Sequence, residues 1–303
     1  MATRLTDEGE NRRSHETSVS AKWGRGYSTP LAPDEHQSTD KQSNIEPDMP
    51  AHDDGPVTSV HPVVAFFDVD NTLLRGASVY HVSRAAWKRG LVRWRDVSTF
   101  AWHQARFIAV GENTKHISSA KERALGLAKG HPAGSLRQIA EEIYATDIET
   151  RLWPETVALA RDHLARGHQV WLITAAPIDI AQVIAKNLGL TGALGTLLAT
   201  AEGKFTGELD GPILHGEEKA VAARELTSSL GSNLAECFAY SDSSNDIPLL
   251  GLVGNRVVVN PDAVLAAYAK ANAWQILSLD PASIRATLRQ MKRQNRKLRR
   301  SAL

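Results

Sequence analysis

Two carboxylates separated by one residue follow a continuous apolar run. Asp68 and Asp70 come directly after VVAFF (63–67), and Thr72 completes the sequence DVDNT. In an open α/β sheet, the carboxyl end of a buried strand borders the ligand crevice. Two acids that lie close together repel each other, so one of them tends to keep its proton. The pair suits a reaction in which one carboxylate attacks and the other acid donates a proton.

Two further residues are suited to binding phosphate. Thr174 ends the apolar run QVWLIT, where its hydroxyl and the backbone N–H of Ala175 would hold a phosphate oxygen. Lys219 lies early in a predicted helix, where a buried ammonium would neutralise a phosphoryl group or an attacking carboxylate. Taken singly, a threonine here is more often an ordinary strand residue, and a lysine here is usually solvated.

A second acidic cluster follows another apolar run. In YSDSSNDIPLL, Asp242, Asn245 and Asp246 come after AECFAY (235–240). Oxygen ligands of this kind suit a hard cation such as Mg²⁺. A turn rich in Ser, Asn and Asp is the alternative explanation when the cluster is considered alone.

The elements needed to position these residues alternate along the chain. Strand-like runs cover 63–67, 169–174, 235–240 and 256–260, and amphipathic helical patterns such as 154–167 and 216–231 lie between them. This alternation predicts an α/β protein with a doubly wound, mostly parallel sheet. The carboxyl ends of its strands would bring the acidic and phosphate-binding residues together.

Two segments interrupt the alternation. Residues 77–150 contain helical patterns and no strand-like run, which predicts an inserted helical lobe. Residues 197–212, around Glu202-Gly203-Lys204, are predicted to form a small β-hairpin with a glycine turn.

The two ends of the chain carry opposite charges. Residues 1–60 hold 6 basic and 11 acidic residues and only ten large apolar ones, which predicts a disordered acidic and polar extension. Residues 285–303 hold 8 basic residues and no acid, and we expect a basic tail there. The predicted domains are therefore a core of 61–76 with 151–284, a helical cap of 77–150, and the two extensions.

The overall composition excludes several classes of protein. With 42% hydrophobic and 23% charged residues and a net charge of +1, the chain is neither collagen-like nor wholly disordered. Its single cysteine, Cys237, rules out an internal disulfide. No apolar run approaches the ~20 residues of a membrane span, and no secretory pattern is present, so we expect a cytoplasmic protein.

In combination, the four motifs resemble the haloacid dehalogenase superfamily. The shared order is Asp-x-Asp-x-Thr, a strand-terminal Thr, a Lys and Asp-x-x-x-Asp, and the resemblance covers roughly residues 61–260. The helical insertion looks like a C1 cap, and EGKFTGELDGPILHGEEKA resembles the phosphoserine phosphatase-like branch, subclass IB. Asp70 distinguishes the chain from the dehalogenases proper, and Val69-Asp70 distinguishes it from the P-type ATPases.

The resemblance implies a magnesium-dependent phosphatase. Asp68 would be the nucleophile that forms an aspartyl phosphate, and Asp70 the general acid and base. The metal ligands would be Asp68, the main-chain carbonyl of Asp70 and Asp242, with Asp246 orienting a water or Lys219.

In the same way, Lys219 would offset charge on the phosphoryl group as the third catalytic residue. Thr174, the N–H of Ala175 and Asn245 would bind the phosphate oxygens. We therefore expect Mg²⁺ as the cofactor.

The substrate is less specified. Phosphoserine phosphatases carry Gly-Asp-Gly in the last motif and a glutamate after the first, whereas this chain has Ser241-Asp242-Ser243 and no acid between Asp70 and Asp96. A small phosphorylated metabolite such as phosphoserine is expected, with a phospholipid head group or lysophospholipid phosphate as the alternative. Arg75, Tyr80 and Arg106 are candidates for contacts with the leaving group.

Other functions stay open at this stage. The chain could be a phosphotransferase, or a membrane-associated binding protein whose active site is vestigial. The basic tail would give peripheral contact with an anionic membrane, or would simply be solvated. No nucleic-acid partner is expected.

Overall fold

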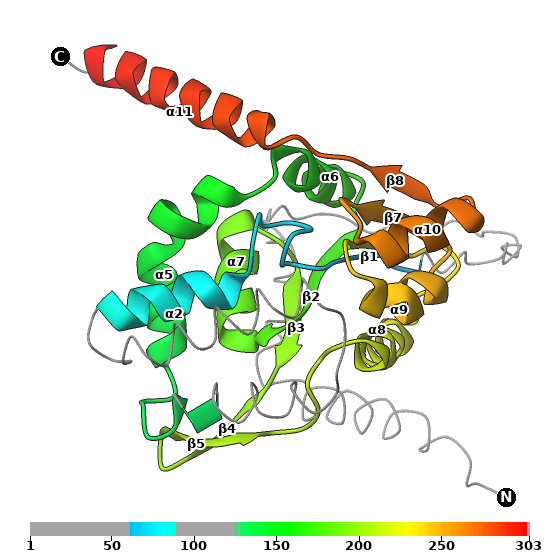
Figure 1. Cartoon of the computed structure of the whole chain (residues 1–303), viewed down its shortest axis with the longest axis horizontal. Helices are drawn as coiled ribbons and strands as arrows, with labels where there is room; N and C mark the ends of the chain where they lie inside the picture. The colour runs from blue at the N-terminus through cyan, green and yellow to red at the C-terminus, as the bar shows by residue number, and fades with distance from the viewer. Residues whose placement is uncertain (1–60, 89–124, 127, 302–303) are drawn as a thin grey trace, which may run out of the picture.

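A central parallel sheet organises the protein, whose computed structural model describes residues 61–88, 125–126 and 128–301 (Figure 1). Its six strands lie in the order β3-β2-β1-β6-β7-β8, and every neighbouring pair is parallel. The strands are β1 Val64–Phe67, β2 Gln169–Pro177, β3 Gly192–Thr196, β6 Phe238–Ser241, β7 Asn255–Val259 and β8 Gln275–Leu277. The α/β class predicted from the alternating pattern is confirmed.

Helices cover both faces of the sheet because its strands are apolar on both sides. In β1, Val64 and Phe66 belong to one hydrophobic cluster, and Ala65 and Phe67 to another. The first cluster contains residues of α8 (Glu217–Leu230), α9 (Ile247–Leu252) and α10 (Ala263–Ala271). The second contains residues of α5 (Ser135–Ile143), α6 (Pro154–Ala165) and α7 (Ile178–Leu188). The sheet is therefore sandwiched between two helical layers.

The strand order places a topological switch point next to β1. From β1 the chain adds β2 and β3 on one side, and β6 then pairs with β1 on the other side, with Phe67 opposite Tyr240. The N–H of Asp68 donates to the Tyr240 carbonyl at 2.9 Å, so the carboxyl ends of β1 and β6 stay side by side. Ligands bind at such points in open α/β sheets.

Local signals set the ends of the predicted helices. Pro154 occupies the first turn of α6, where its missing N–H leaves no intrahelical bond unmade. Helix α8 ends at Gly231, which adopts a left-handed φ of 66° that glycine tolerates well. Both helices match the segments expected from the sequence to within two residues.

The strand predictions need three corrections. Strand β6 starts at Phe238 and not at Ala235, because the Cys237 N–H bonds the Leu234 carbonyl in a turn. Strand β2 continues three residues past Thr174, because its pairing with β3 resumes at Pro177 after an irregularity. Strands β3 and β8 were not predicted: β3 is glycine-rich, and β8 has only three residues.

The interrupting segments also form ordered structure. Strands β4 (Leu198–Ala201) and β5 (Lys204–Leu209) pair antiparallel, which confirms the predicted hairpin. In the described part of 77–150 lie α2 (Ser78–Lys88), α5, the π-helix η1 (Tyr144–Ile148) and the 3-10 helix η2 (Glu149–Arg151), whereas 89–124 and 127 are outside the described residues. The division into core and cap stays a prediction.

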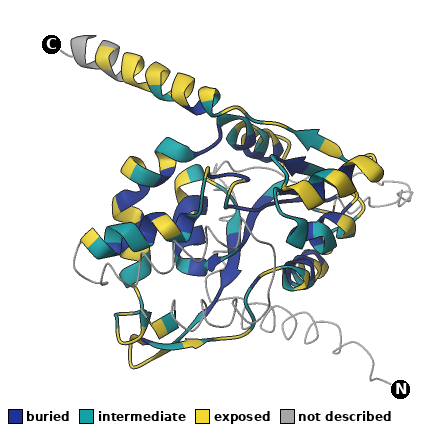
Figure 2. Ribbon diagram, in the orientation of Figure 1, coloured by how far each residue is buried: buried dark blue, intermediate teal, exposed yellow. Residues whose placement is uncertain are grey.

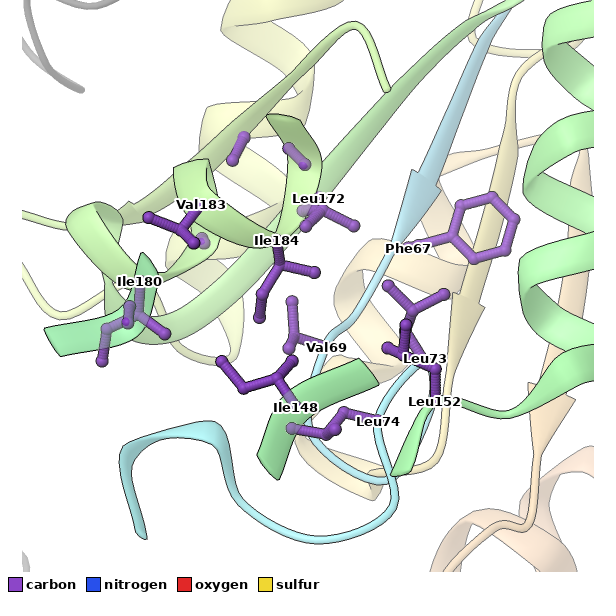
Figure 3. Close-up of a cluster of buried hydrophobic side chains, with 14 of the residues drawn as sticks. Phe67, Val69, Leu73, Leu74, Ile148, Leu152, Leu172, Ile180, Val183 and Ile184 are labelled. Carbon is purple, nitrogen blue, oxygen red and sulfur yellow. The ribbon is translucent and has the colours of Figure 1, made fainter. Parts of the chain in front are cut away.

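A hydrophobic cluster fixes the loop that follows β1. Val69, Leu73 and Leu74 of this loop are fully buried and lie in one cluster with Ile148 and Ile184 (Figure 3). The N–H groups of Leu73 and Leu74 bond the Val69 carbonyl at 3.0 and 2.8 Å, which closes a tight turn. The loop that carries Asp70 is thus held by apolar packing and by its own backbone.

The basic tail forms part of a long helix, α11 (Pro281–Ser301), which begins four residues before the predicted boundary. Its first turn is anchored, since Ile284 is buried and Ser283 Oγ donates to Glu155 at 3.2 Å. Beyond this turn the helix projects from the body with mostly exposed side chains (Figure 2). Among the described residues, no helix is long and apolar enough to cross a membrane.

We predict opposite effects from alanine at two nearby glycines. A Cβ at Gly254 would overlap the backbone carbonyl of Ala235, whereas a Cβ at Gly251, in helix α9, would meet nothing within 4 Å. Gly254→Ala should lower the free energy of unfolding by about 1–3 kcal/mol, because backbone must move. Gly251→Ala should raise it by about 0.5–1 kcal/mol through helix propensity. Denaturant unfolding measures both changes. An unchanged free energy of unfolding in Gly254→Ala would contradict the close contact with the Ala235 carbonyl.

Acid should weaken the fold through His163. This buried imidazole lies 2.8 Å from the Tyr240 hydroxyl and 2.9 Å from the His168 ring, and burial lowers its pKa to about 4. Between pH 6.5 and 4 the unfolded chain therefore binds a proton that the native state excludes, so stability falls as the pH falls. We expect a loss of up to about 2 kcal/mol from this group. In His163→Gln the stability lost between pH 6.5 and 4 should be correspondingly smaller. If the free energy of unfolding depends on pH equally in both proteins, His163 is not the responsible group.

Candidate active site

The side chain of Lys219 lies between two buried carboxylates. Its ammonium donates to Asp68 Oδ1 at 2.6 Å and to Asp246 Oδ2 at 2.7 Å. The three side chains are 5%, 8% and 2% exposed, respectively. Residues that are 151 and 27 positions from Lys219 along the chain therefore meet at one charged centre.

Each member of this centre sits at the end of a regular element. Asp68 follows β1, and Lys219 lies in the first turn of α8, which begins after Gly216 at a left-handed φ of 59°. Asp246 ends the 3-10 helix η3 (Ser244–Asp246) and also accepts a 2.6 Å hydrogen bond from Ser241 Oγ. These rigid supports fix the ammonium relative to the strand end.

The other two predicted acids lie at the same strand ends and are more exposed. Asp242 Oδ1 accepts a hydrogen bond from Thr72 Oγ1 at 3.2 Å, which links the first and last motifs. Asp70 Oδ1 accepts the backbone N–H of Ser78 at 2.8 Å. Burial raises the pKa of Asp70, and the hydrogen bond from the Ser78 N–H opposes that rise.

Burial and neighbouring negative charge together raise the pKa values of the acids. Burial raises the pKa of Asp68 well above its ordinary value, against the attraction of Lys219, and the neighbouring carboxylates raise it further. Burial, followed by repulsion from Asp246, raises the pKa of Asp242 to about 7. Burial alone would lower the pKa of Lys219, but its two carboxylate partners outweigh that effect and raise it. One ammonium is too little cation for four carboxyl groups.

These residues fit a divalent cation. Carboxylate oxygens are hard ligands of the kind Mg²⁺ binds, and the neighbouring carboxylates add to the effect of burial in raising the pKa values of Asp68 and Asp242. Within the described ranges, no three Asp, Glu, His or Cys side chains are grouped to hold a metal by themselves. The predicted set needs only two side chains, Asp68 and Asp242, with the main-chain carbonyl of Asp70.

The predicted phosphate-binding residues form hydrogen bonds with residues outside the charged centre. Thr174 is buried, and its hydroxyl accepts the N–H of Ala176 at 3.2 Å. The carbonyl of Ala175 accepts the hydroxyl of Thr196 at 2.7 Å. Asn245 donates its side-chain N–H to Ser243 Oγ at 3.2 Å, within its own turn. Within the described structure, none of these bonds joins the three residues to Lys219, and their phosphate role stays a prediction.

Sequence reasoning missed several supporting residues. Ser241 holds Asp246, and Asp262 Oδ2 accepts the Ser244 N–H at 2.6 Å, which fixes the last motif against the end of β7. Ser78 was not singled out, although its position eight residues after Asp70, near the start of the predicted helical segment, can be read from the sequence.

Tyr80, a predicted candidate for leaving-group contacts, is 41% exposed and packs edge-on against His81.

Of the remaining candidates for leaving-group contacts, Arg75 is exposed and donates its backbone N–H to the Arg151 carbonyl at 2.9 Å. Arg106 lies outside the described residues. Neither position establishes a contact with the acids, and both roles stay predictions.

The fold and the site define a hydrolase class, which comparison with known proteins establishes. The haloacid dehalogenase-like hydrolase family matches residues 65–251, and the chain belongs to this family. Phosphoserine phosphatase SerB1 of Mycobacterium tuberculosis is 46% identical over 213 residues, which cover 70% of this chain and 69% of that protein. The chain is accordingly a phosphoric monoester hydrolase of the phosphoserine phosphatase-like kind.

Solved structures support the same fold. A protein of unknown function from Bordetella pertussis Tohama I is 27% identical with a TM-score of 0.63, covering 72% of this chain and 99% of that one. A substrate-bound phosphoserine phosphatase has a TM-score of 0.54 at 19% identity, covering 76% of this chain and 98% of that one. At that identity the second likeness bears on the fold alone.

We predict that removing one negative charge from the site stabilises the metal-free protein. In EDTA, Asp242→Asn should raise the free energy of unfolding by about 1 kcal/mol, because repulsion from Asp246 disappears. Mg²⁺ should raise the melting temperature of the unsubstituted chain and have a smaller effect on the variant. Thermal unfolding with and without Mg²⁺ tests this, with the exposed Asp210→Asn as control. An unchanged Mg²⁺ shift in Asp242→Asn would remove Asp242 from the ligand set.

Proposed function

We propose that this protein is a magnesium-dependent phosphatase that hydrolyses a small phosphomonoester through an aspartyl phosphate. The observation that carries the proposal is the buried Lys219 held at 2.6 Å from Asp68 and 2.7 Å from Asp246. A buried cation beside a carboxylate at a strand end suits an attack on an anionic phosphoryl group, since it offsets charge on both partners.

In the first half of the reaction, Asp68 is the nucleophile. A carboxylate oxygen of Asp68 forms a bond to phosphorus as the bond from phosphorus to the ester oxygen breaks. Asp70 gives its proton to the departing alkoxide, which leaves as an alcohol. The raised pKa of Asp70 favours the protonated form that this step requires.

In the second half, water releases the phosphate. Asp70, now a carboxylate, takes a proton from a water molecule that attacks phosphorus, and the bond to Asp68 breaks. Inorganic phosphate leaves, and both acids return to their starting states. Lys219 stays paired with Asp68 and Asp246 and limits the charge that builds up near them.

The Mg²⁺ would be held by Asp68, Asp242 and the main-chain carbonyl of Asp70. Asp246 would orient Lys219 through their hydrogen bond. When bound, the ion would offset negative charge on the transferring phosphoryl group. Thr174, the N–H of Ala175 and Asn245 are the residues that would receive phosphate oxygens.

The physiological ester is the open part of the proposal. SerB1, a relative named for phosphoserine, makes phosphoserine the first candidate among small phosphorylated metabolites. A lysophospholipid phosphate or phospholipid head group, transfer to an acceptor other than water, and peripheral membrane contact through the basic tail stay predictions. The cytoplasmic location and the lack of a nucleic-acid partner also stay predictions.

The decisive test is phosphate release by the purified chain from a generic phosphomonoester. We expect turnover that needs Mg²⁺, stops with EDTA, and falls at least about a thousandfold in Asp68→Asn, since no nucleophile remains. Mass spectrometry of acid-quenched enzyme should locate a phosphoryl group on Asp68. Asp210→Asn is the matched control and should keep normal turnover. Full activity of Asp68→Asn would overturn the mechanism.

A further inference from the structure

Two buried polar atoms on α2 have no hydrogen-bond partner. In the described part of the chain, the unpartnered buried side-chain atoms include Ser78 Oγ and His81 Nδ1. Ser78 is fully buried and His81 is 7% exposed. A buried polar group without a partner is uncommon and unfavourable in native proteins, so each such atom requires an explanation.

The first of these residues contacts the proposed general acid, and the second lies one helical turn away from the first. The Ser78 backbone N–H bonds Asp70 Oδ1 at 2.8 Å, and the Ser78 hydroxyl is near enough to affect the pKa of that carboxyl. His81 lies three residues further along α2, and residues with this spacing share one face of a helix. Asp70 protonates the leaving oxygen in the proposed mechanism, so the leaving group departs beside the start of this face.

Positively charged side chains lie further along the same helix. A cavity of about 130 Å³ is lined by His81, Arg84, Ala85, Lys88, Ile143 and Asp147. Asp147 is the one acid of this lining, and it is already shared by Arg84 at 3.8 Å and Arg151 at 4.0 Å. Residues 71–88 contain no acid at all. The cavity wall therefore has an excess of cationic groups.

Helix geometry sets the reach of this surface. An α-helix rises 1.5 Å per residue, so His81 lies about 4.5 Å and Arg84 about 9 Å beyond Ser78 along the axis. A leaving group of a few carbon atoms, starting at the ester oxygen near Asp70, spans the first distance. The flexible side chain of Arg84 covers the remainder. A second anion on the leaving group would thus meet hydrogen-bond donors and positive charge.

We propose that the α2 row, defined as Ser78, His81, Arg84 and Lys88, is the leaving-group subsite and selects phosphomonoesters that carry a second anionic group. This inference rests on the proposed phosphatase function and adds the substrate class. The anion is a carboxylate or a second phosphate. An ammonium on the substrate gains nothing from the row, because the row contains no acid.

Four esters separate these features. Phosphoserine has a carboxylate and an ammonium, 3-phosphoglycerate only the carboxylate, phosphoethanolamine only the ammonium, and glycerol 3-phosphate neither. We expect kcat/KM for the two carboxylates to exceed that for the other two by at least about tenfold, as a charge-assisted hydrogen bond provides. Propane-1,3-diol bisphosphate carries a second phosphate in place of the carboxylate. Its kcat/KM shows which of the two anions the row prefers.

Substitution of Arg84 tests the charge. Arg84→Gln should reduce the preference for 3-phosphoglycerate over glycerol 3-phosphate by about tenfold, chiefly through KM. Arg84→Lys, which keeps the charge, should retain most of the preference. Arg161 is exposed on α6, and Arg161→Gln makes the same change of charge there. This control variant should change kcat/KM for neither ester. The Arg84 side chain is 42% exposed, so the variants should fold.

Ser78→Ala separates a binding role from a structural one. Removing a buried hydroxyl that has no partner should leave the melting temperature equal or higher. The same variant should lose about threefold or more in kcat/KM for 3-phosphoglycerate. A structural hydroxyl would give the reverse result, with a lower melting temperature and an unchanged kcat/KM.

Two outcomes contradict the proposal in distinguishable ways. If all four esters are hydrolysed equally and Arg84→Gln changes no ratio, the phosphatase function stands and the α2 row is not the subsite. If no ester releases phosphate in the presence of Mg²⁺, the phosphatase function fails, and the inference built on it fails as well.

Discussion

The buried ion pair of Lys219 with Asp68 and Asp246 is the constraint on which the rest of the site depends. Taking three charged groups out of water is unfavourable unless their geometry is good and their remaining hydrogen bonds are made. Here both contacts are short, and Ser241 gives Asp246 a further hydrogen bond. The end of β1, the first turn of α8 and the last motif must therefore keep fixed positions relative to one another.

The sheet makes this constraint possible. Because β1 and β6 are parallel neighbours, Asp68 and Asp242 emerge at the same edge, and helices on both faces remove water from the strands below them. Peptide groups in the strands are paired, so the polar groups left at this edge are free to act on a ligand. The resulting cluster of carboxyl groups is held in place by the fold, and Lys219 offsets only part of its negative charge.

The sequence predicted the parts of this arrangement that are local. Apolar runs identified β1 and β7, and the motif residues followed them at recognisable spacings. It did not predict β3. Gly192 of this strand leaves room for the Trp171 ring opposite it, and this requirement for a glycine arises only after the two strands pair. The unpartnered atoms of Ser78 and His81 were equally invisible, since a missing hydrogen-bond partner is a property of the folded neighbourhood and not of a residue type.

In the proposed function, chemistry and substrate choice are carried by different parts of the chain. The acids and Lys219 stand on strand ends and helix starts, so a change among them alters the charge balance of the whole centre. Helix α2 touches that centre through the Ser78 N–H on Asp70, and its further residues face a cavity shared with Ile143 and Asp147. Residues one or two turns along α2 can therefore vary without moving the acids. A fold of this kind can keep one phosphoryl-transfer chemistry while the leaving group that it accepts changes.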